Sequence, residues 1–404
     1  MTAANGIAAM QVRPGHPDFL DLPWDLPLAR WPGRCPRIVE VQRGVSRHEV
    51  LFVQYDRAVY AVKELPLRLG EREYDSLRWL EDHRLPAVLA AGHARVRTAE
   101  GEASVLLTRF LDGSLPYRTL FEQAGLATYR ERLIDAMAGL LVRLHLAGFY
   151  WGDCSLSNTL FRRDAGELQA YLVDAETSEM HERLSDGQRR HDLEILEENV
   201  TGDLADVAAM LELQLPEELD RTGSDVRARY ECLWGEITRE EILSPTESWR
   251  IHERIRALNA LGFTVGEVEL QATGNGSRLR MRTIVTDRDY HRHLLHAHTG
   301  LVTEDRQATL MVGEVQELRA TLMRVENRSV PLSVAAYRWL VERYQPAARR
   351  LAPLVGARGD SAELYCQMLE HKWYLSEREK RDVGHDRAVE DFVKRFRPEG
   401  GGAR

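Results

Sequence analysis

The chain has 404 residues, 44% of them hydrophobic, and its 54 basic and 63 acidic side chains give a formal net charge of −9. This length and hydrophobic content predict two or three packed domains and exclude a disordered chain. The negative charge gives no electrostatic support to nonspecific binding of nucleic acid or of an anionic membrane, so neither is expected as a partner.

The cysteines and the N-terminal sequence predict a cytoplasmic protein. No C-x-x-C pair occurs, which predicts reduced thiols and no zinc site; the four cysteines are Cys35, Cys154, Cys232 and Cys366. We expect Cys154 to be a small buried residue, with an oxidant-sensitive thiol as the alternative. No basic-plus-apolar leader and no apolar run of about 18 residues is present, so no membrane span is expected.

Residues 1–33, the first segment in chain order, are predicted to form a proline-rich arm. Its prolines disfavour regular structure, and they are Pro14, Pro17, Pro23, Pro27 and Pro32. Its large apolar side chains offer anchors on a domain surface, and they are Phe19, Leu20, Trp24, Leu26 and Trp31. We therefore expect an ordered arm rather than a free tail.

Residues 34–107 are predicted to form strands with one helix, and residues 106–113 the last strand and a hinge. Residues 39–53 have the pattern of two strands around a turn with a single glycine, Gly44. Gly44 and Ser46 could donate backbone and hydroxyl hydrogen bonds to a phosphate. One glycine, however, falls short of the G-x-G-x-x-G pattern of phosphate-binding loops.

Lys63 is unusual because the chain has fifty arginines and four lysines, and the next lysine is Lys372. It ends an apolar strand, where a compact ammonium group would reach phosphate oxygens; a surface lysine is the alternative. A helix predicted for residues 71–80 follows. It places Glu73 on one face with i, i+4, i+7 spacing, so Glu73 is the expected partner of Lys63 and Glu71 is the alternative.

Residues 108–215 are predicted to be mainly helical and to carry the reactive groups. A helix over residues 129–145 ends at His145, which we expect to be a packing residue. Asp153 follows, then Asn158 five positions later, and Asp174 at the end of an apolar strand. Asp153 could orient an attacking hydroxyl or accept its proton, while Asn158 and Asp174 offer hard oxygen ligands to Mg²⁺.

A predicted hairpin brings two of these residues together. Residues 159–162 and 170–173 have strand character and are joined by the turn-like residues 163–167. Pairing of the strands would place Asn158 and Asp174 side by side at the open end of the hairpin. A surface hairpin with scattered polar residues is the alternative, but the combination with Asp153 favours a phosphoryl-transfer site.

The pattern of Lys63, Asp153, Asn158 and Asp174 resembles the protein-kinase-like superfamily over about the first 215 residues. The chain resembles the atypical bacterial branches of this superfamily more than ordinary Ser/Thr kinases. These branches are lipopolysaccharide-kinase-like, aminoglycoside-phosphotransferase-like and RIO-like. The resemblance implies a two-lobed fold, with an N-lobe at 34–107 and a C-lobe at 108–215. It also implies ATP and Mg²⁺ as cofactors.

Several departures from protein kinases bear on the substrate. Gly152 stands in place of the arginine before the catalytic aspartate, Ser155 in place of a lysine, and Asp174-Ala175-Glu176 in place of Asp-Phe-Gly. An Asp-x-Glu ending is familiar from small-molecule phosphotransferases. No A-P-E element follows Glu176. These differences favour a small-molecule or glycan-like acceptor over a protein.

Residues 216–404 are predicted to form a mixed, mainly helical C-terminal domain. We expect a helix at 251–261, a hairpin of 265–270 with 278–285, and helices over the last hundred residues. The whole chain is similar to uncharacterised bacterial proteins with a C-terminal domain of unknown function, a likeness carried by residues 364–366 and 373–378. Large aromatic side chains there offer anchors for substrate selection or a homo-oligomer, and packing in the domain core is the alternative for each; they are Trp339, Tyr344, Tyr365, Trp373 and Tyr374.

Two further clusters in the C-terminal domain are interpreted as surface features. The histidines lack a neighbouring carboxylate that would complete a metal motif, and they are His291, His293, His296 and His298. Arg278, Arg280 and Arg282 alternate along one strand and could bind phosphate, but a solvated face is the preferred interpretation.

The sequence thus predicts an α+β protein with a two-lobed kinase-like fold followed by the C-terminal domain. The leading function is ATP- and Mg²⁺-dependent transfer of a phosphoryl group to a small-molecule or glycan-like hydroxyl. A catalytically silent nucleotide-binding regulator or scaffold is the alternative, and a purely structural assembly module is the third possibility. The four residues Lys63, Asp153, Asn158 and Asp174 favour catalysis, whereas the single glycine of the loop favours the silent protein.

Overall fold

The computed structural model separates the chain into two compact units. The first comprises Met1–Arg162 and Leu168–Glu236, and the second comprises Arg163–Glu167 and Ile237–Arg404. The structure describes residues 6–41, 48–98, 101–122, 126–165, 167–210, 217–239, 241–243, 265–273, 278–285, 290–326, 330–355 and 360–396. Each unit has its own hydrophobic core.

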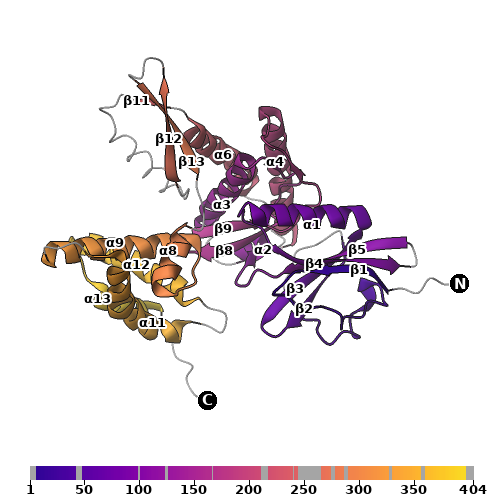
Figure 1. The fold of residues 1–404 in the computed structure, drawn as a ribbon, viewed down its shortest axis with the longest axis horizontal. Helices are drawn as coiled ribbons and strands as arrows, with labels where there is room; N and C mark the ends of the chain where they lie inside the picture. Colours follow the sequence, from indigo (N-terminus) through magenta and orange to yellow (C-terminus); the bar gives the residue numbers. More distant parts are fainter. Residues whose placement is uncertain are drawn as a thin grey trace. The chain divides into compact units, whose positions relative to one another are not determined.

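A five-stranded antiparallel sheet forms the N-terminal part of the first unit (Figure 1). Its strand order is β1-β4-β5-β3-β2, with β1 (Gly6–Val12), β2 (Val50–Tyr55), β3 (Ala58–Pro66), β4 (Leu89–Thr98) and β5 (Gly101–Arg109). Helix α1 (Leu67–Asp82) packs against β3, β4 and β5. Because side chains alternate along a strand, Val62 and Lys63 of β3 point to opposite faces of this sheet, and Lys63 lies on the α1 face.

The N-terminal arm covers the other face of the sheet, as the sequence predicts. Its aromatic and aliphatic side chains pack with Val53, Val62 and Leu107 in one core cluster; the buried arm residues are Phe19, Leu22, Trp24, Leu28 and Trp31. Leu20, expected to be an anchor, is instead exposed. The arm also begins with strand β1, which the sequence did not predict. All five prolines of the arm follow this strand, so they do not interrupt its pairing with β4.

The rest of the first unit is mainly helical. The long helices are α3 (Leu126–Leu146), α4 (Asp186–Met210) and α6 (Thr222–Thr238), and the short ones are η1 (Leu28–Arg30), α2 (Tyr117–Glu122) and α5 (Glu217–Asp220). The predicted hairpin is present as β8 (Thr159–Asp164) and β9 (Glu167–Leu172), and β6 (Leu115–Pro116) pairs with β8. A small two-stranded pair consists of β7 (Phe149–Tyr150) and β10 (Glu179–Met180).

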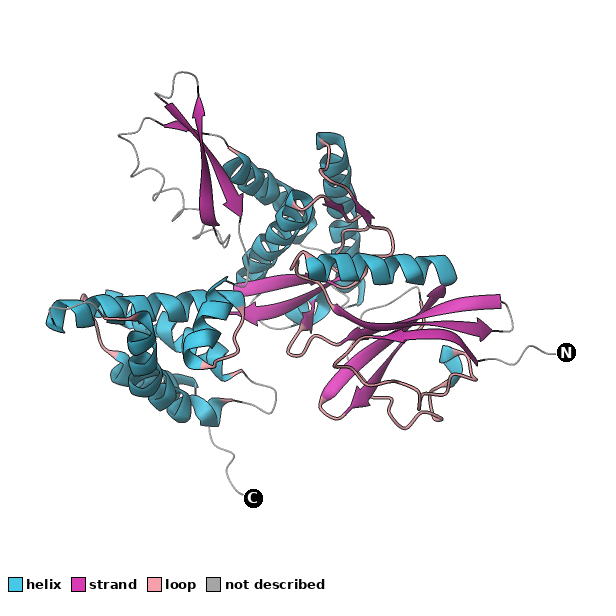
Figure 2. Cartoon of the chain, viewed as in Figure 1, coloured by secondary structure: helices cyan, strands magenta, loops and turns pink. Residues whose placement is uncertain are grey.

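The second unit combines a three-stranded sheet with a helical bundle (Figure 2). The predicted hairpin is present as β12 (Val265–Thr273) and β13 (Arg278–Val285), with β11 (Glu241–Leu243) on the other side of β13. The helices are α8 (Tyr290–Thr299), α9 (Asp305–Glu326), α10 (Leu332–Trp339), η3 (Leu340–Tyr344), α11 (Gln345–Leu351), η4 (Ala352–Leu354), α12 (Ser361–Glu379) and α13 (His385–Phe396). The helix predicted for residues 251–261 lies outside the described residues.

Glu314 of α9 is the polar centre of the helical bundle. Its carboxylate accepts hydrogen bonds from Trp339 Nε1 (3.0 Å), the hydroxyl of Tyr365 (2.7 Å) and Nε2 of His385 (2.9 Å). The rings of Trp339, Tyr344 and Tyr365 pack on one another around it, with centroids 4.9 to 5.9 Å apart. Three of the five aromatic residues predicted as surface anchors are therefore core residues.

The turn between β8 and β9 belongs to the second unit. Asp164 in this turn is 3% exposed and accepts hydrogen bonds from the backbone N–H groups of Arg306 (3.0 Å) and Gln307 (2.9 Å) at the start of α9. Ala165 N donates to Glu363 of α12 at 2.6 Å. The first N–H groups of a helix have no partner within the helix, so Asp164 caps α9 from a distant part of the chain.

The structure confirms the mixed α+β fold class, with most of the described strands in the first unit and long helices in both units. The first unit extends to residue 236 and includes α5 and α6, while the predicted boundary near residue 215 lies outside the described ranges. The four-part division of the chain stays a prediction. Among the described residues, no helix has the length and apolar character needed to cross a membrane.

Candidate active site

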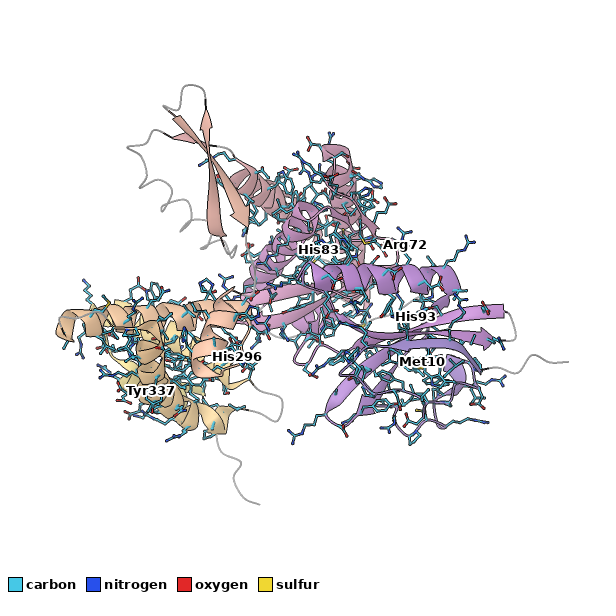
Figure 3. The ribbon with its side chains drawn as sticks, viewed as in Figure 1. Met10, Arg72, His83, His93, His296 and Tyr337 are labelled. Carbon is cyan, nitrogen blue, oxygen red and sulfur yellow. The ribbon has the colours of Figure 1, made fainter. Side chains whose placement is uncertain are left out.

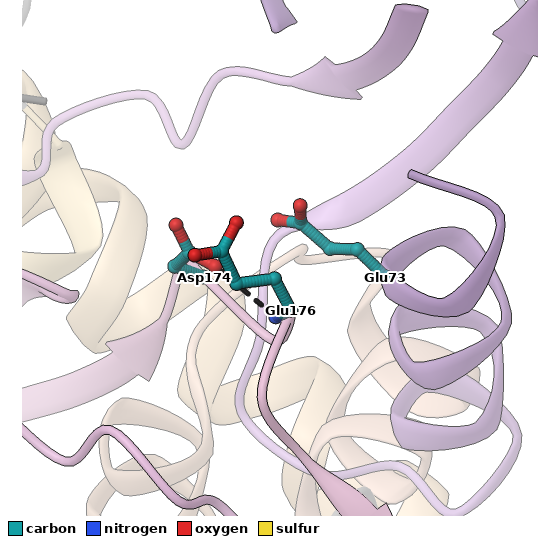
Figure 4. Close-up of side chains that lie close together, drawn as sticks. All are labelled: Glu73, Asp174 and Glu176. Atoms are coloured by element: carbon teal, nitrogen blue, oxygen red, sulfur yellow. Dashed lines mark hydrogen bonds between the residues drawn. The ribbon is translucent and has the colours of Figure 1, made fainter. Parts of the chain in front are cut away.

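Lys63 lies among three carboxylates in the first unit. Its Nζ is 3.0 Å from Glu73 Oε2, 2.6 Å from Asp174 Oδ2 and 3.6 Å from Glu176 Oε2. Figure 4 shows the three carboxylates converging, with Glu176 N donating to Asp174 Oδ1 at 3.1 Å. The alternative partner of Lys63, Glu71, pairs instead with Arg95 at 2.7 Å. The helix therefore points Glu73 inward and Glu71 outward.

Helix α1 is also bound to the segment that follows Asp174. Arg72, labelled in Figure 3, donates from Nε to the carbonyl of Ser178 at 3.1 Å. The hydroxyl of Ser178 donates to the hydroxyl of Ser76 on the same helix at 2.9 Å. These contacts fix the segment against the helix that carries Glu73, which explains why groups about a hundred residues apart meet at one point.

The charges at this site are unbalanced, and the pKa values shift accordingly. Burial beside Asp174 raises the pKa of Glu73 to about 8, despite the opposing effect of Lys63. The pKa of Lys63 is also raised, because the carboxylates of Glu73 and Asp174 outweigh the cost of burying the ammonium group. The excess of carboxylates thus raises the pKa of Lys63 against the effect of burial, and it adds to the effect of burial at Glu73.

The three carboxylates fit a divalent cation. Among the described residues, this is the one place where three carboxylate, imidazole or thiolate groups approach closely, and ligand oxygens of Glu73, Asp174 and Glu176 lie within 4.8 Å of one another. Glu176 Oε2 is buried, and it lies 3.1 Å from His48 Nε2 and 3.6 Å from Lys63 Nζ. Hard carboxylate oxygens with surplus negative charge are the donor set that Mg²⁺ prefers. The sequence predictions did not include Glu176 as a ligand, although the Asp-x-Glu pattern was visible.

Asp153 is held by two asparagine side chains. Asn158 Nδ2 donates to Asp153 Oδ2 at 3.0 Å, and Asn199 Nδ2 donates to Asp153 Oδ1 at 3.1 Å. Val173 N donates to the carbonyl of Asn158 at 3.0 Å, which places Asn158 and Asp174 at the same end of the hairpin, as predicted. Asn199 was missed because it lies on α4 and follows Asp153 by 46 residues, outside any local motif.

The backbone before Asp153 is fixed by a glycine and a buried aspartate. Gly152 has φ +78°, and a Cβ atom there would lie 2.9 Å from the carbonyl oxygen of Thr177, so glycine is needed at this position. Asp192 accepts from the N–H groups of Trp151 and Gly152, both at 2.8 Å. His145 is buried as predicted, but its Nε2 also lies 3.1 Å from Asp192 Oδ2, so it is more than a packing residue.

The remaining predicted phosphate-contacting residues, Gly44 and Ser46, lie outside the described residues. The flanks of this segment are described. Val39 N donates to the carbonyl of Phe52 at 2.9 Å, which continues the sheet beyond β2. On the other side, His48 Nε2 lies 3.1 Å from Glu176 Oε2. Val39 thus lies beside β2, and His48 lies beside one of the three carboxylates.

Other reactive side chains do not form a second centre among the described residues. Cys154 is fully buried, and this burial raises the pKa of its thiol well above the usual value, which disfavours the reactive alternative. The four histidines of α8 belong to no cluster of three candidate ligands in the part of the chain that is described. Arg278, Arg280 and Arg282 lie on strand β13, which pairs with β12.

Comparisons with known proteins match two separate regions of the chain. Residues 54–217 match the model of the lipopolysaccharide kinase (Kdo/WaaP) family, and residues 232–396 match the model of a domain of unknown function, DUF4032. A solved structure titled "WaaP in complex with acyl carrier protein" is 16% identical, with 55% of this chain and 88% of that chain covered and a TM-score of 0.34. No curated protein matches the chain. The family models confirm the resemblance to a kinase-like region followed by a domain of unknown function.

Proposed function

We propose that this protein is an ATP- and Mg²⁺-dependent phosphotransferase that acts on a hydroxyl group of a small-molecule or glycan-like acceptor. The observation that carries the proposal is the meeting of Lys63 with Glu73, Asp174 and Glu176 inside the region that matches the lipopolysaccharide kinase model. A single ammonium group beside surplus carboxylates suits a site that receives a metal ion and a polyphosphate together.

In this proposal each charged group has a separate task. Lys63 binds phosphate oxygens of ATP, and Glu73, itself buried, holds the lysine in place. Asp174, with Asn158 as predicted from the sequence and with Glu176 as the structure suggests, would hold Mg²⁺. The bound ion would supply positive charge to the phosphate oxygens as negative charge develops on them during transfer.

Asp153 is proposed to orient the acceptor hydroxyl and to accept its proton. The amide groups of Asn158 and Asn199 each donate to one carboxylate oxygen of Asp153, so the carboxylate is fixed before the acceptor arrives. A general base of this kind contributes through its position as much as through its basicity. Asn158 would therefore contact both Asp153 and the metal, through its nitrogen and its oxygen respectively.

A small acceptor is favoured by the segment that follows Asp174. Helix α4 begins at Asp186, soon after Asp174, and the residues between them are fully described. This segment is bound on both sides, because Thr177 Oγ1 donates to the carbonyl of Trp151 at 2.9 Å and Ser178 is bound to α1. It therefore leaves no long loop there for a protein substrate, which fits the sugar substrate suggested by the family match.

A nucleotide-binding protein without catalysis is the second candidate. The observation that favours it is the single glycine in residues 39–53, where phosphate-covering loops of active kinases carry several. Both candidates require ATP binding, but the silent protein has no need of the paired asparagines that fix Asp153.

Nucleotide binding is tested first, by calorimetry and by thermal unfolding with ATP, with and without Mg²⁺. At a hundred times its dissociation constant, ATP with Mg²⁺ should stabilise the fold by about 2.7 kcal/mol. Asp174→Ala should abolish the metal-dependent part, whereas Glu71→Gln, which alters a partly exposed ion pair on the same helix α1, should leave it unchanged. Absence of metal-dependent binding at millimolar ATP would contradict both candidates.

Catalysis is tested by incubating the protein with ATP, Mg²⁺ and a library of sugars and other hydroxyl-bearing metabolites. ATP consumption is measured, and a phosphorylated product is identified by mass spectrometry. A product with wild type and none with Asp153→Asn supports the phosphotransferase. Equal cellular function of wild type and Asp153→Asn, with ATP binding retained in both, would favour the silent protein.

We further propose that the second unit selects the acceptor or mediates self-association. Trp373 and Tyr374 of α12 support this role, because they are 58% and 55% exposed and their rings pack together with centroids 5.0 Å apart. Aromatic side chains of this kind often carry much of the energy of an interface. Light scattering of the double variant Trp373→Ser/Tyr374→Ser tests self-association, and an unchanged mass would leave acceptor selection as the role of this unit.

A further inference from the structure

Helix α6 follows the segment that matches the kinase family, yet it belongs to the same compact unit. The family match ends at residue 217, α6 begins at Thr222, and the unit extends to Glu236. Tyr230 of α6 is 1% exposed, and its hydroxyl lies 2.8 Å from Nδ1 of His145 on α3. The two rings are in edge-to-face contact, with centroids 5.3 Å apart. A side chain from outside the matched segment thus contacts a histidine close to the candidate active site.

The hydrogen bonds around Tyr230 have a defined direction. Arg189 donates from Nη1 to the hydroxyl oxygen of Tyr230 at 3.3 Å, so the hydroxyl hydrogen is free to point at Nδ1 of His145. The other ring nitrogen of His145, Nε2, faces Asp192 Oδ2, a carboxylate oxygen that accepts. A neutral histidine with its hydrogen on Nε2 satisfies both contacts, since such a ring accepts at Nδ1 and donates at Nε2.

The far end of this chain of hydrogen bonds is the backbone that precedes Asp153. Asp192 Oδ2, which faces His145, also accepts from Trp151 N, while Asp192 Oδ1 accepts from Gly152 N. Asp192 and His145 are both buried, so each depends on protein partners in place of water. The orientation of Asp192 is therefore coupled to the ring of His145, and that ring is coupled to Tyr230.

We propose that Tyr230, and through it helix α6, is a positioning element of the active site. Its hydroxyl sets the tautomer and the orientation of His145, so that Asp192 keeps both oxygens on the backbone N–H groups of Trp151 and Gly152. The Asp153 carboxylate is thereby presented in one place. Tyr230 touches no substrate in this scheme, and its effect on turnover rests on the proposed phosphotransfer function, whereas its effect on the backbone does not.

The stack around Tyr230 explains why a phenylalanine variant is the suitable test. The ring of Tyr230 packs on Trp234 with centroids 5.8 Å apart, and the guanidinium of Arg189 lies 4.0 Å from the centroid of the Trp234 ring. Tyr230→Phe keeps these ring contacts and removes the hydroxyl alone. Tyr365→Phe is the matched control, because it removes another buried hydroxyl, bound to Glu314 at 2.7 Å, in the second unit.

The first measurement needs no enzymatic activity and uses the full-length protein. In wild type, ¹⁵N spectra of the histidine rings should show His145 with its hydrogen on Nε2 and a hydrogen-bonded Nδ1. In Tyr230→Phe the Nδ1 signal should shift, and the amide hydrogens of Trp151 and Gly152 should exchange about tenfold faster with solvent. Tyr365→Phe should change neither. Unchanged amide exchange in Tyr230→Phe would overturn the proposal.

The second measurement uses the acceptor found by the metabolite screen. Tyr230→Phe should lower kcat about tenfold and leave the KM for ATP unchanged, because nucleotide contacts lie elsewhere, whereas Tyr365→Phe should leave both unchanged. Equal kcat values for Tyr230→Phe and wild type would refute the positioning role in catalysis. If wild type transfers no phosphate, the proposed function fails, and the exchange rates of Trp151 and Gly152 still decide whether Tyr230 holds the backbone.

Discussion

The two units each contain a partly buried charged centre, and the two centres are built in opposite ways. In the first unit, three carboxylates surround one ammonium group, and burial beside Asp174 raises the pKa of Glu73 to about 8. In the second unit, the single carboxylate of Glu314 receives three donors, and the hydrogen bond from His385 contributes most to lowering its pKa despite burial. The first centre has an excess of negative charge with which to bind a ligand, whereas three hydrogen-bond donors already satisfy the carboxylate of Glu314.

This difference separates a binding site from a structural centre without reference to any known protein. A buried polar group that is fully satisfied specifies one packing of its neighbours, and its loss costs stability. A buried group with surplus charge costs stability until a ligand arrives, which is the usual condition of a functional site. By this criterion Glu314 is a structural residue of the C-terminal bundle, whereas Glu73, Asp174 and Glu176 form the site where we propose that a metal ion and a nucleotide bind.

The largest expected effect is on turnover in the first unit. Asp153→Asn should lower kcat by about 100- to 10,000-fold and leave ATP affinity within about twofold of wild type, because the side chain acts on the acceptor. Steady-state kinetics and calorimetry measure the two quantities. Asp206→Asn, at an exposed position of α4, is the control and should retain full activity. Equal losses in both variants would contradict the role of Asp153.

The next effect is on the stability of the second unit. Glu314→Ala should lower its free energy of unfolding by about 3 kcal/mol, because the indole, hydroxyl and imidazole donors would lose their shared acceptor. Urea unfolding followed by tryptophan fluorescence measures the change. Glu317→Ala, an exposed position of the same helix, should cost far less. A small effect of Glu314→Ala would show that water replaces the carboxylate and that this centre is not structural.

The stability of the first unit should decrease as pH rises, which is the direction expected for a site with excess negative charge. The pKa of Glu73 is about 8 in the fold against 4.5 for an ordinary glutamate, so the folded state binds the proton more tightly. This contribution to stability is therefore full below about pH 4.5 and is lost as pH rises through 8, by about 5 kcal/mol for a shift of this size. Glu73→Gln should flatten this slope, and millimolar Mg²⁺ should counteract the loss at high pH.

The Glu314 centre should respond to pH in the opposite direction. Because the pKa of Glu314 is lowered, its contribution to stability is present above the pKa of an unfolded glutamate and is lost as pH falls through the folded pKa. Thermal unfolding of wild type, Glu73→Gln and Glu314→Ala over this pH range would separate the two contributions. The same slope in wild type and Glu73→Gln between pH 5 and 8 would contradict the pKa shift of Glu73.

The smallest expected effect concerns the cap of α9. Asp164→Ala should destabilise the second unit by about 1 kcal/mol, because Arg306 and Gln307 would lose the acceptor of their N–H groups. Asp164→Asn keeps one acceptor oxygen and should cost less. Hydrogen exchange of the first turn of α9 checks both variants. Equal protection in Asp164→Ala and wild type would mean that another group caps the helix.

The sequence predicted those parts of the candidate site that depend on residues close together along the chain. The strand of Lys63, the helix of Glu73 and the hairpin between Asn158 and Asp174 follow from periodicity and turn residues, and each is present. These are local patterns, and the kinase-like spacing of the acidic and amide residues made them specific. To predict the ion pair of Lys63 with Glu73, the helical spacing that places Glu73 on one face of its helix was also needed.

The residues that support the site could not be found in this way. Asn199 and Asp192 contact the backbone or side chains of residues 151–154 from α4, about forty positions downstream, and Tyr230 reaches His145 across 85 positions. Asparagine, aspartate and tyrosine are common on helices, so their identity carries no signal without the tertiary packing. Glu176 was visible in the sequence, but its membership of the carboxylate cluster depends on how α1 packs.

The β8–β9 turn is a part of the second unit that lies within the sequence of the first unit. Asp164 precedes Arg306 by 142 residues in the sequence, and it accepts a hydrogen bond from the N–H group of Arg306. The chain passes between the two units three times, after residues 162, 167 and 236. A polypeptide ending just after α6 would carry part of the C-terminal fold, and the remainder would lack the group that caps its α9. The second piece would therefore depend on the first for its helix cap, so the two would not be independent modules joined by a linker.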